Sequence, residues 1–437
     1  MSLSAGFHSR RRRQLMDCIG AGGAALVPAA SERVRSNDVE FRFRQSSDFD
    51  YLTGFPEPDA LCLLLPGHPE HEFVLFVRPR DPERETWTGR RVGVEGAMIV
   101  YGADVAHPLD KVEELVPRML EERERLFYAV DHRGEYNNKI LGWIESLQAA
   151  RQRSGVGPTV LSDVRPALHE MRVIKDAEEI GAMRIAAQVS CAAHRRAMTT
   201  VRAGQFEYQV EAEVEYIFRS RGAAGPAYPS IVATGGNATT LHYTENCCEL
   251  DADHLLLIDA GAEVNLYCGD VTRTFPVGDR FDGRQRAIYE VVLAAQEAAI
   301  LEVRPGVALD EIHRAALHVL VRGLVDLGIL AGRVDDCIAE ESYRPYYMHR
   351  TSHWLGKDVH DVGLYRAGGA PRLLEPGMIL TVEPGLYLSE ESGAPPQWQG
   401  IGVRIEDDVL VTEAGFDVLT LDAPKDIDEI EALRREA

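Results

Sequence analysis

The sequence of 437 residues is poor in cysteine, and its seven thiols show no CxxC spacing typical of structural zinc sites or redox pairs. Because their number is odd and they are scattered, we expect no disulfide framework and a cytoplasmic location. Long apolar runs are also missing, so no membrane span is expected. The four arginines at 10–13 precede no apolar stretch, which argues against a secretory signal. We expect them to form the exposed face of an N-terminal helix.

Positive charge is scarce as well. Lys and Arg total 47 against 69 Asp and Glu, a formal net charge of −22. Such an excess repels nucleic acid and anionic membranes, so neither is an expected partner. The remaining composition, 45% hydrophobic and 27% charged, is ordinary for a globular protein and leaves room for two or three domains.

The pattern of segments predicts two domains, 1–170 and 171–437. In the first, strand-like and helix-like segments alternate, which predicts an α/β domain with a central sheet. The strand-like segments are 24–29, 60–65, 72–77 and 125–130, the helix-like ones lie near 10–19, 110–123 and 137–150, and 151–159 is expected to be a surface connection.

In the second domain, Asp176 and Glu179 have the spacing of a capping box, which predicts a long helix to about Arg202. A second helix follows, and two more are predicted near 283–303 and 308–328, each pair preceding strands. This order predicts two similar α+β halves around one sheet.

The strongest functional signal is a set of acidic residues and one histidine in the second domain: Asp259, Asp270, His353, Glu383 and Glu406. An apolar strand-like run ends at Asp259, and another ends at Glu383 just before Pro384 and Gly385. Taken singly, such residues are more often caps, packed histidines or loop residues. Together, four carboxylates and one imidazole form a hard ligand set that can hold two divalent cations. Mn(II), Fe(II) or Co(II) suits it at least as well as Zn(II).

These residues lie in motifs that resemble the pita-bread metallopeptidases, and in particular the aminopeptidase P group. The motifs are FRFRQSSDFDYLTGFPEPDA from Phe41, WTGRR around Trp87, LHYTEN around His242 and RPYYMHRTSHWLGKDVHDVG around His353. The resemblance covers nearly the whole chain. It implies a catalytic domain with pseudo-twofold symmetry and two bound metal ions, most often Mn(II), held by the five residues above. It also implies a homo-oligomer, a dimer or tetramer, in which Trp87 contributes to the cleft of a neighbouring subunit.

The resemblance further implies roles for residues beyond the ligands. His242, His349 and His360 are expected to contact the substrate, from a loop or strand rather than a helix. Arg404, Tyr228 and Tyr387 complete the candidate substrate-binding set. The hypothesis is that a metal-bridging hydroxide attacks the Xaa–Pro bond of a peptide with proline in second position. Glu383 would carry the proton, while His242 and His360 would stabilise the intermediate.

Three points stay open. A prolidase, which takes only dipeptides, is the nearest alternative to an Xaa-Pro aminopeptidase, and a non-enzymatic binding protein with this fold is a second. The aromatic residues Tyr346, Tyr347 and Trp354 could shape a proline pocket or belong to the core. Finally, Arg350 stands where related enzymes usually have glycine, so positive φ would be strained there and an extra cation would reach the cleft.

Overall fold

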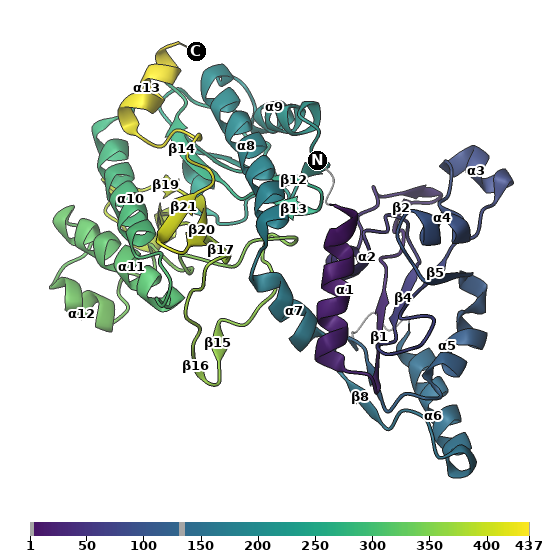
Figure 1. Ribbon diagram of the computed structural model, residues 1–437. Helices are drawn as coiled ribbons and strands as arrows, with labels where there is room; N and C mark the ends of the chain where they lie inside the picture. The colour runs from purple at the N-terminus through teal and green to yellow at the C-terminus, as the bar shows by residue number, and fades with distance from the viewer. Residues whose placement is uncertain (1–3, 131–135, 437) are drawn as a thin grey trace. The chain divides into compact units, whose positions relative to one another are not determined.

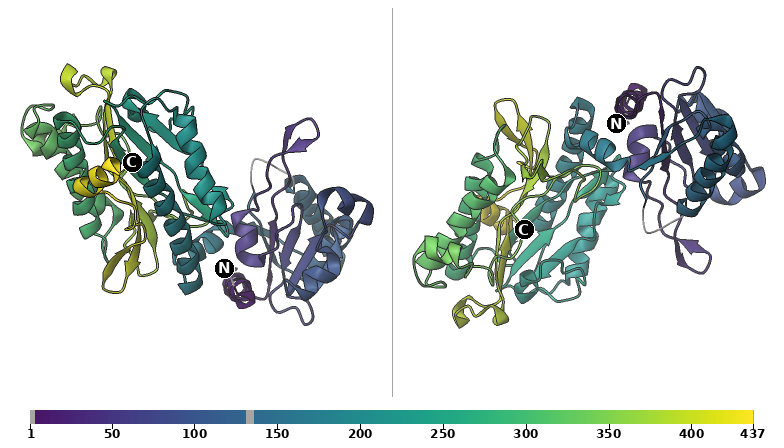
Figure 2. Two further views of the ribbon diagram at one scale, coloured as in Figure 1. Left: turned by 90° about the horizontal axis from the view of Figure 1, so that it is seen from above. Right: turned by 90° about the horizontal axis from the view of Figure 1, so that it is seen from below.

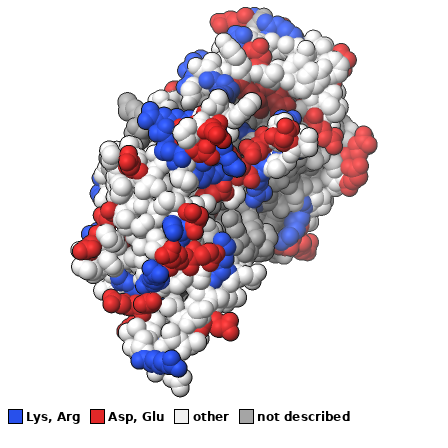
Figure 3. Space-filling model, turned by 90° about the vertical axis from the view of Figure 1, so that its right-hand side faces the viewer, with Lys and Arg blue, Asp and Glu red and all other residues white. Residues whose placement is uncertain are grey.

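The computed structural model describes residues 4–130 and 136–436, which form two compact units, 4–171 and 172–436 (Figure 1). Helix α7 (Arg165–Val173) contains the boundary between them. In the part of the chain that is described, no helix is long and apolar enough to cross a membrane. On the face drawn in Figure 3, acidic and basic side chains are interspersed.

The N-terminal unit is built on a six-stranded sheet in the order β6-β5-β4-β1-β7-β8. Apolar side chains such as Leu26, Leu63 and Phe76 bury one of its faces against α5 and α6, where Val116 and Trp143 lie. The elements are α1 (Ala5–Ile19), β1 (Gly23–Pro28), β2 (Val34–Ser36), β3 (Val39–Glu40), α2 (Ser47–Thr53), β4 (Leu61–Leu64), β5 (Phe73–Val77), α3 (Pro82–Thr88), α4 (Gly93–Ile99), β6 (Val105–Pro108), α5 (Val112–Leu120), β7 (Arg125–Phe127), α6 (Asn137–Ser154) and β8 (Val160–Ser162).

Two expectations for this unit are correct only in part. Arg10 and Arg13 are exposed on α1, but Arg11 and Arg12 are buried, since only 9% and 7% of their surfaces are accessible. Arg12 donates to the carbonyl of Leu52 at 2.8 Å and stacks over the ring of Phe73, and these contacts compensate its burial. The expected connection at 151–159 also begins later, because α6 continues through Ser154.

The second unit contains two helix pairs, each followed by strands, and the pairs lie on either side of the strands (Figures 1 and 2). The capping box of Asp176 and Glu179 is confirmed at the start of α8. The helices are α8 (Ala177–Thr200), α9 (Glu207–Ser220), α10 (Gly283–Leu301), α11 (Leu309–Asp326), α12 (Val334–Ala339) and α13 (Ile427–Arg435). The strands are β9 (Gly225–Pro226), β10 (Ile231–Thr234), β11 (Leu255–Asp259), β12 (Ala262–Val264), β13 (Tyr267–Cys268), β14 (Thr272–Pro276), β15 (Arg366–Ala367), β16 (Ala370–Pro371), β17 (Ile379–Val382), β18 (Gly385–Leu388), β19 (Ile401–Arg404), β20 (Asp407–Thr412) and β21 (Gly415–Val418).

One sheet was expected for this unit, but the structure has several short β-ladders instead. They have the orders β10-β11-β14, β13-β12-β9, β17-β20-β21 and β18-β19. An isolated bridge between Thr272 and Glu406 links a strand of the first half to the second half. Because Thr272 is also opposite Asp259 in the β11–β14 ladder, this bridge brings carboxylates from both halves to one place.

A close backbone approach sets the distance between the first two of these carboxylates. A methyl group at Gly261 would meet the carbonyl oxygen of Gly269 at 1.7 Å. Gly261 lies two residues after Asp259, and Gly269 directly precedes Asp270. Only glycine at position 261 therefore allows the two acidic segments to lie so near each other.

Substituting Gly261 with alanine should destabilise the protein by about 3 kcal/mol or more, because backbone rather than a flexible side chain must move. The matched control is Gly236→Ala, where the added methyl group meets nothing within 4 Å. Urea unfolding followed by circular dichroism measures both. Equal midpoints for the two variants would contradict this view of the close approach.

Candidate active site

A cavity of about 620 Å³ in the second unit is lined by all five predicted metal ligands. It is also lined by His242, His349 and His360, so the structure brings together the candidate ligands and the candidate substrate-binding histidines. Arg404 and Tyr228 line the cavity as well. Tyr387 does not line it, and only 1% of its surface is exposed.

The candidate ligands lie at or near the ends of strands. Asp259 is the last residue of β11, and Glu383 directly follows β17. The segment before His353 runs beside β17, because the amides of Thr381 and Glu383 donate to the carbonyls of His353 and Thr351 at 3.0 and 2.8 Å. Glu406 also lies outside the strands. It lies between β19 and β20, where its amide donates to the carbonyl of Thr272 at 3.1 Å.

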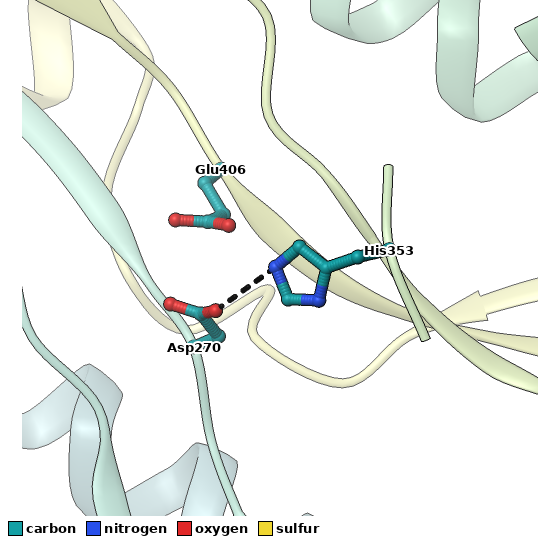
Figure 4. A group of neighbouring side chains, drawn as sticks. All are labelled: Asp270, His353 and Glu406. Atoms are coloured by element: carbon teal, nitrogen blue, oxygen red, sulfur yellow. Dashed lines mark ion pairs between the residues drawn. The ribbon is translucent and has the colours of Figure 1, made fainter. Parts of the chain in front are cut away.

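Asp270, His353 and Glu406 point toward one another (Figure 4), and one donor atom from each lies within 4.8 Å of the others. His353 Nδ1 is 3.0 Å from the carbonyl oxygen of Trp354 and must therefore be the protonated nitrogen in that bond. Its Nε2 lies 3.4 Å from Asp270 and 3.7 Å from Glu383. A lone pair facing two carboxylates needs a proton or a cation between them, and a metal ion meets that need.

The protonation of the site shows how strongly its negative charges repel. Burial, together with Asp270 and Asp259, raises the pKa of Glu383 to about 7, despite the opposing charges of His353 and Arg404. Burial and the neighbouring carboxylates also raise the pKa of Glu406 and of Asp259. Burial lowers the pKa of His353, but Asp270 and Glu383 outweigh it and raise the value to about 9. Without metal, the cluster therefore holds protons at neutral pH.

Two side chains compensate part of the charge. Arg404 donates to Asp259 Oδ2 at 2.6 Å, to the hydroxyl of Thr272 at 3.1 Å and to the hydroxyl of Tyr387 at 3.0 Å. The hydroxyl of Tyr228 lies 2.6 Å from Asp259 and 2.5 Å from Asp270. Because a hydroxyl has one hydrogen to donate, it cannot satisfy both carboxylates, and further positive charge is still needed.

The hydrogen bonds of His349 fix its tautomer. Its Nδ1 donates to the carbonyl of Arg350 at 2.7 Å, and its Nε2 accepts from the hydroxyl of Tyr387 at 2.8 Å, which itself accepts from Arg404. Burial, with Arg404, lowers the pKa of His349 to about 3, so the ring is neutral. Both ring nitrogens are thus engaged. In contrast, the ring of His360 stands edge-on to His353 with centroids 4.4 Å apart and is exposed to the cavity.

The structure also decides whether the aromatic residues near His353 belong to the cavity or the core, and where Arg350 lies. Tyr346, Tyr347 and Trp354 are 6%, 1% and 1% exposed and belong to the core, whereas Tyr365, stacked on Trp354, lines the cavity instead. Arg350 does not adopt positive φ, so its backbone carries no strain of that kind. Its side chain is 69% exposed at the cavity wall, and its nearest carboxylate, Asp310, is 3.6 Å away.

Sequence reasoning missed several supporting residues. Thr272 donates to Glu406 Oε2 at 2.6 Å. The only indication of this role in the sequence is that Thr272 lies two residues after Asp270. Asp361, directly after His360, is buried between Lys175 Nζ at 3.0 Å and Arg172 at 2.5 Å. These partners are more than 180 residues away in the chain, and no local pattern indicated them.

A carboxylate-rich cavity with one histidine among its ligand candidates and three more histidines on its wall, at the ends of strands flanked by helix pairs, defines a metallohydrolase site. The model of metallopeptidase family M24 matches residues 181–413, and the model of the aminopeptidase P N-terminal domain matches residues 8–128. The chain belongs to family M24, with the two-domain arrangement of aminopeptidase P and its pita-bread catalytic domain. The resemblance seen in the motifs is confirmed.

Relatives match over nearly the whole chain. The Xaa-Pro aminopeptidase of Escherichia coli K12 is 44% identical over 428 residues, 97% of this chain and 96% of that protein. Human Xaa-Pro aminopeptidase 3 is 35% identical and is matched over 86% of its length by 98% of this chain. Among solved structures, Pseudomonas aeruginosa aminopeptidase PepP superimposes with a TM-score of 0.97 at 48% identity, covering 99% of this chain and 98% of that one. An Escherichia coli aminopeptidase P variant in complex with substrate has a TM-score of 0.96 at 42% identity, covering 100% and 99%.

Metal binding should release protons and strengthen as pH rises from about 6 to about 9, because ligands must be deprotonated to bind. This direction follows because the pKa of Glu383 is raised to about 7 and that of His353 to about 9. Both groups therefore keep protons on the metal-free site at neutral pH, and metal binding must displace them. Calorimetric titration of Mn(II) at pH 7 in buffers of different ionisation enthalpy measures the release. A binding enthalpy that does not change with the buffer would contradict the prediction.

Proposed function

We propose that this protein is an Xaa-Pro aminopeptidase, which releases the first residue from peptides with proline in second position. The observation that supports this most is the single cavity that unites five metal-ligand candidates with His242, His349 and His360. The relatives named Xaa-Pro aminopeptidase support it independently. Retention of all five ligand candidates disfavours a metal-free binding protein.

The residues fit two divalent ions. Asp259, Asp270, Glu383 and Glu406 would provide oxygen atoms, and Nε2 of His353, which faces Asp270 and Glu383, would provide a nitrogen. This donor set suits Mn(II), Fe(II) or Co(II) at least as well as Zn(II), and Mn(II) is proposed on the family resemblance. A zinc-substituted form of the Escherichia coli enzyme exists as a product complex. When bound, the ions would supply Lewis acidity and lower the pKa of a water molecule.

The chain's own residues have distinct roles in this proposal. Glu383 has the proton-carrying role in this proposed mechanism, and its side chain, 17% exposed, is more accessible than those of Asp270, 7%, and Asp259, 12%. His242 and His360, both exposed in the cavity, donate hydrogen bonds to the peptide carbonyl as charge develops on its oxygen. Tyr387 and Arg404 act through His349 and Asp259, so they position the site rather than contact substrate.

The direct test compares Arg-Pro-Pro with Gly-Pro as substrates of metal-stripped protein, with and without added Mn(II). Metal-dependent release of the first residue from the tripeptide is expected. Cleavage of the dipeptide alone would identify a prolidase, and cleavage of neither by metal-loaded protein would favour a binding role.

Replacing Glu383 with glutamine should lower kcat by about 10²- to 10⁴-fold while peptide binding persists, because the amide cannot take up a proton. Since Glu383 is also a ligand candidate, metal content must be measured on the same sample by mass spectrometry of the elements. Glu390→Gln, on an exposed turn, is the matched control. Full turnover by the Glu383 variant with metal bound would rule out the proton-carrying role.

Arg350 should favour substrates with a free C-terminal carboxylate, because its exposed guanidinium lines the cavity and Asp310 is not close enough for a hydrogen bond. Arg350→Ala should raise KM for a tripeptide acid by about two- to fivefold, as expected for an exposed ion pair worth up to about 1 kcal/mol. KM for the matching tripeptide amide should not change, and Arg344→Ala serves as the control variant. An equal rise in KM for the acid and the amide would show that Arg350 affects the shape of the cavity and does not bind the substrate carboxylate through its charge.

Assembly and location complete the proposal. We place the protein in the cytoplasm, because its seven cysteines are odd in number and scattered through the sequence, which is not typical of a disulfide framework. A dimer or tetramer is part of the proposal because the resemblance to aminopeptidase P implies one. Trp87 on α3, which is 88% exposed, is proposed to lie at a contact between copies of the chain, and sedimentation of the wild type against Trp87→Ala tests this.

A further inference from the structure

Two adjacent cysteines, Cys247 and Cys248, are both exposed and free close to the active site. They lie in the loop between β10 and β11, which also carries His242, a residue of the cavity wall. Their sulfur atoms lie 3.9 and 3.8 Å from the same phenol oxygen, that of Tyr243. Neighbouring residues of an extended chain point to opposite sides, so two contacts with one oxygen place both thiols on one side.

This geometry favours a bridging atom over a disulfide. Consecutive Cα atoms are about 3.8 Å apart across a trans peptide, which is shorter than the separation of about 4.4–6.8 Å that a disulfide normally spans. A direct sulfur–sulfur bond between neighbours would therefore be strained. An atom inserted between the sulfurs enlarges the ring and removes most of that strain.

The thiols are tied to a buried carboxylate. Glu207, at the start of α9 and fully buried, accepts hydrogen bonds from the amide of Thr234 and the side chain of Asn237 at 2.8 and 3.0 Å. It also accepts from the hydroxyl of Tyr243 and the amide of Cys248, both at 2.8 Å. Glu207 thus holds the start of the loop and the segment 243–248 together. Because His242 directly precedes Tyr243, a displacement of Tyr243 or Cys248 is expected to move His242 as well.

We propose that Cys247 and Cys248 form a binding site for a thiophilic metal or metalloid ion, and that its occupation lowers activity by displacing the loop that carries His242. Adjacent thiolates select soft ions such as Cu(I), Zn(II) or trivalent arsenic. With a trivalent arsenical R–As=O, two S–H bonds break, two As–S bonds form and the oxygen leaves as water. No oxidant or reductant is required, because arsenic stays trivalent.

Phenylarsine oxide is the appropriate probe for the metal-loaded protein, because zinc or copper would also compete for the carboxylate site. Intact-mass spectrometry should show one arsenical bound to the wild type and removed by a dithiol. Cys247→Ser and Cys248→Ser should each abolish stable binding, since one thiol does not chelate. Cys18→Ser, which removes an exposed but solitary thiol, should bind like the wild type. Unchanged binding in both loop variants, or none in the wild type, would overturn the site.

The effect on activity rests on the proposed peptidase function and is measured separately on Arg-Pro-Pro. Bound arsenical should lower kcat by about ten- to a hundredfold, the effect expected when a contacting residue moves by about 1 Å. Cys247→Ser should keep the untreated rate and resist inhibition. Stoichiometric binding with an unchanged rate would overturn the link to His242. If untreated protein does not cleave the peptide, the proposed function fails, while the mass measurement still decides the site.

Discussion

The mutual repulsion of four buried carboxylates is the constraint on which the rest of the second unit depends. Asp259, Asp270 and Glu406 are 8%, 5% and 2% exposed, and Glu383 joins them at the same cavity. Burying charge of one sign is unfavourable unless it is paired or neutralised. The raised pKa of Glu383, about 7, is the direct consequence. A folded chain with this cluster must therefore hold protons or cations, and the ligand types favour cations.

The surrounding structure both creates and limits this repulsion. Glycine at 261 lets the segments of Asp259 and Asp270 approach, and the Thr272–Glu406 bridge brings in the second half. Arg404 neutralises part of the charge and, through Tyr387, also fixes the ring of His349. Below the site, Arg273 is fully buried and donates to Asp407 at 2.6 Å. The same cation also donates to the carbonyl of Glu406 at 2.6 Å, so it holds the backbone of that ligand candidate in place.

Local patterns predicted what depends on neighbours in sequence. The end of an apolar run located Asp259 and Glu383 at strand ends, and the capping box located the start of α8. Contacts between distant segments were not predictable in this way. Asp361 and Lys175 are 186 residues apart, and neither has a context that indicates an ion pair. The burial of Arg12 and Trp354 likewise depends on which elements pack against them, which hydrophobic periodicity does not specify.

The most direct measurement is the number of divalent ions that the cluster binds. Metal-stripped protein would be titrated with Mn(II) and followed by electron paramagnetic resonance, which separates isolated ions from a coupled pair. Neutralising four carboxylates predicts two ions per chain with a spin-coupled signal, and Asp259→Asn should remove that signal. A single uncoupled ion, or the same signal in the variant, would contradict the view that the carboxylates are gathered to hold a pair of cations.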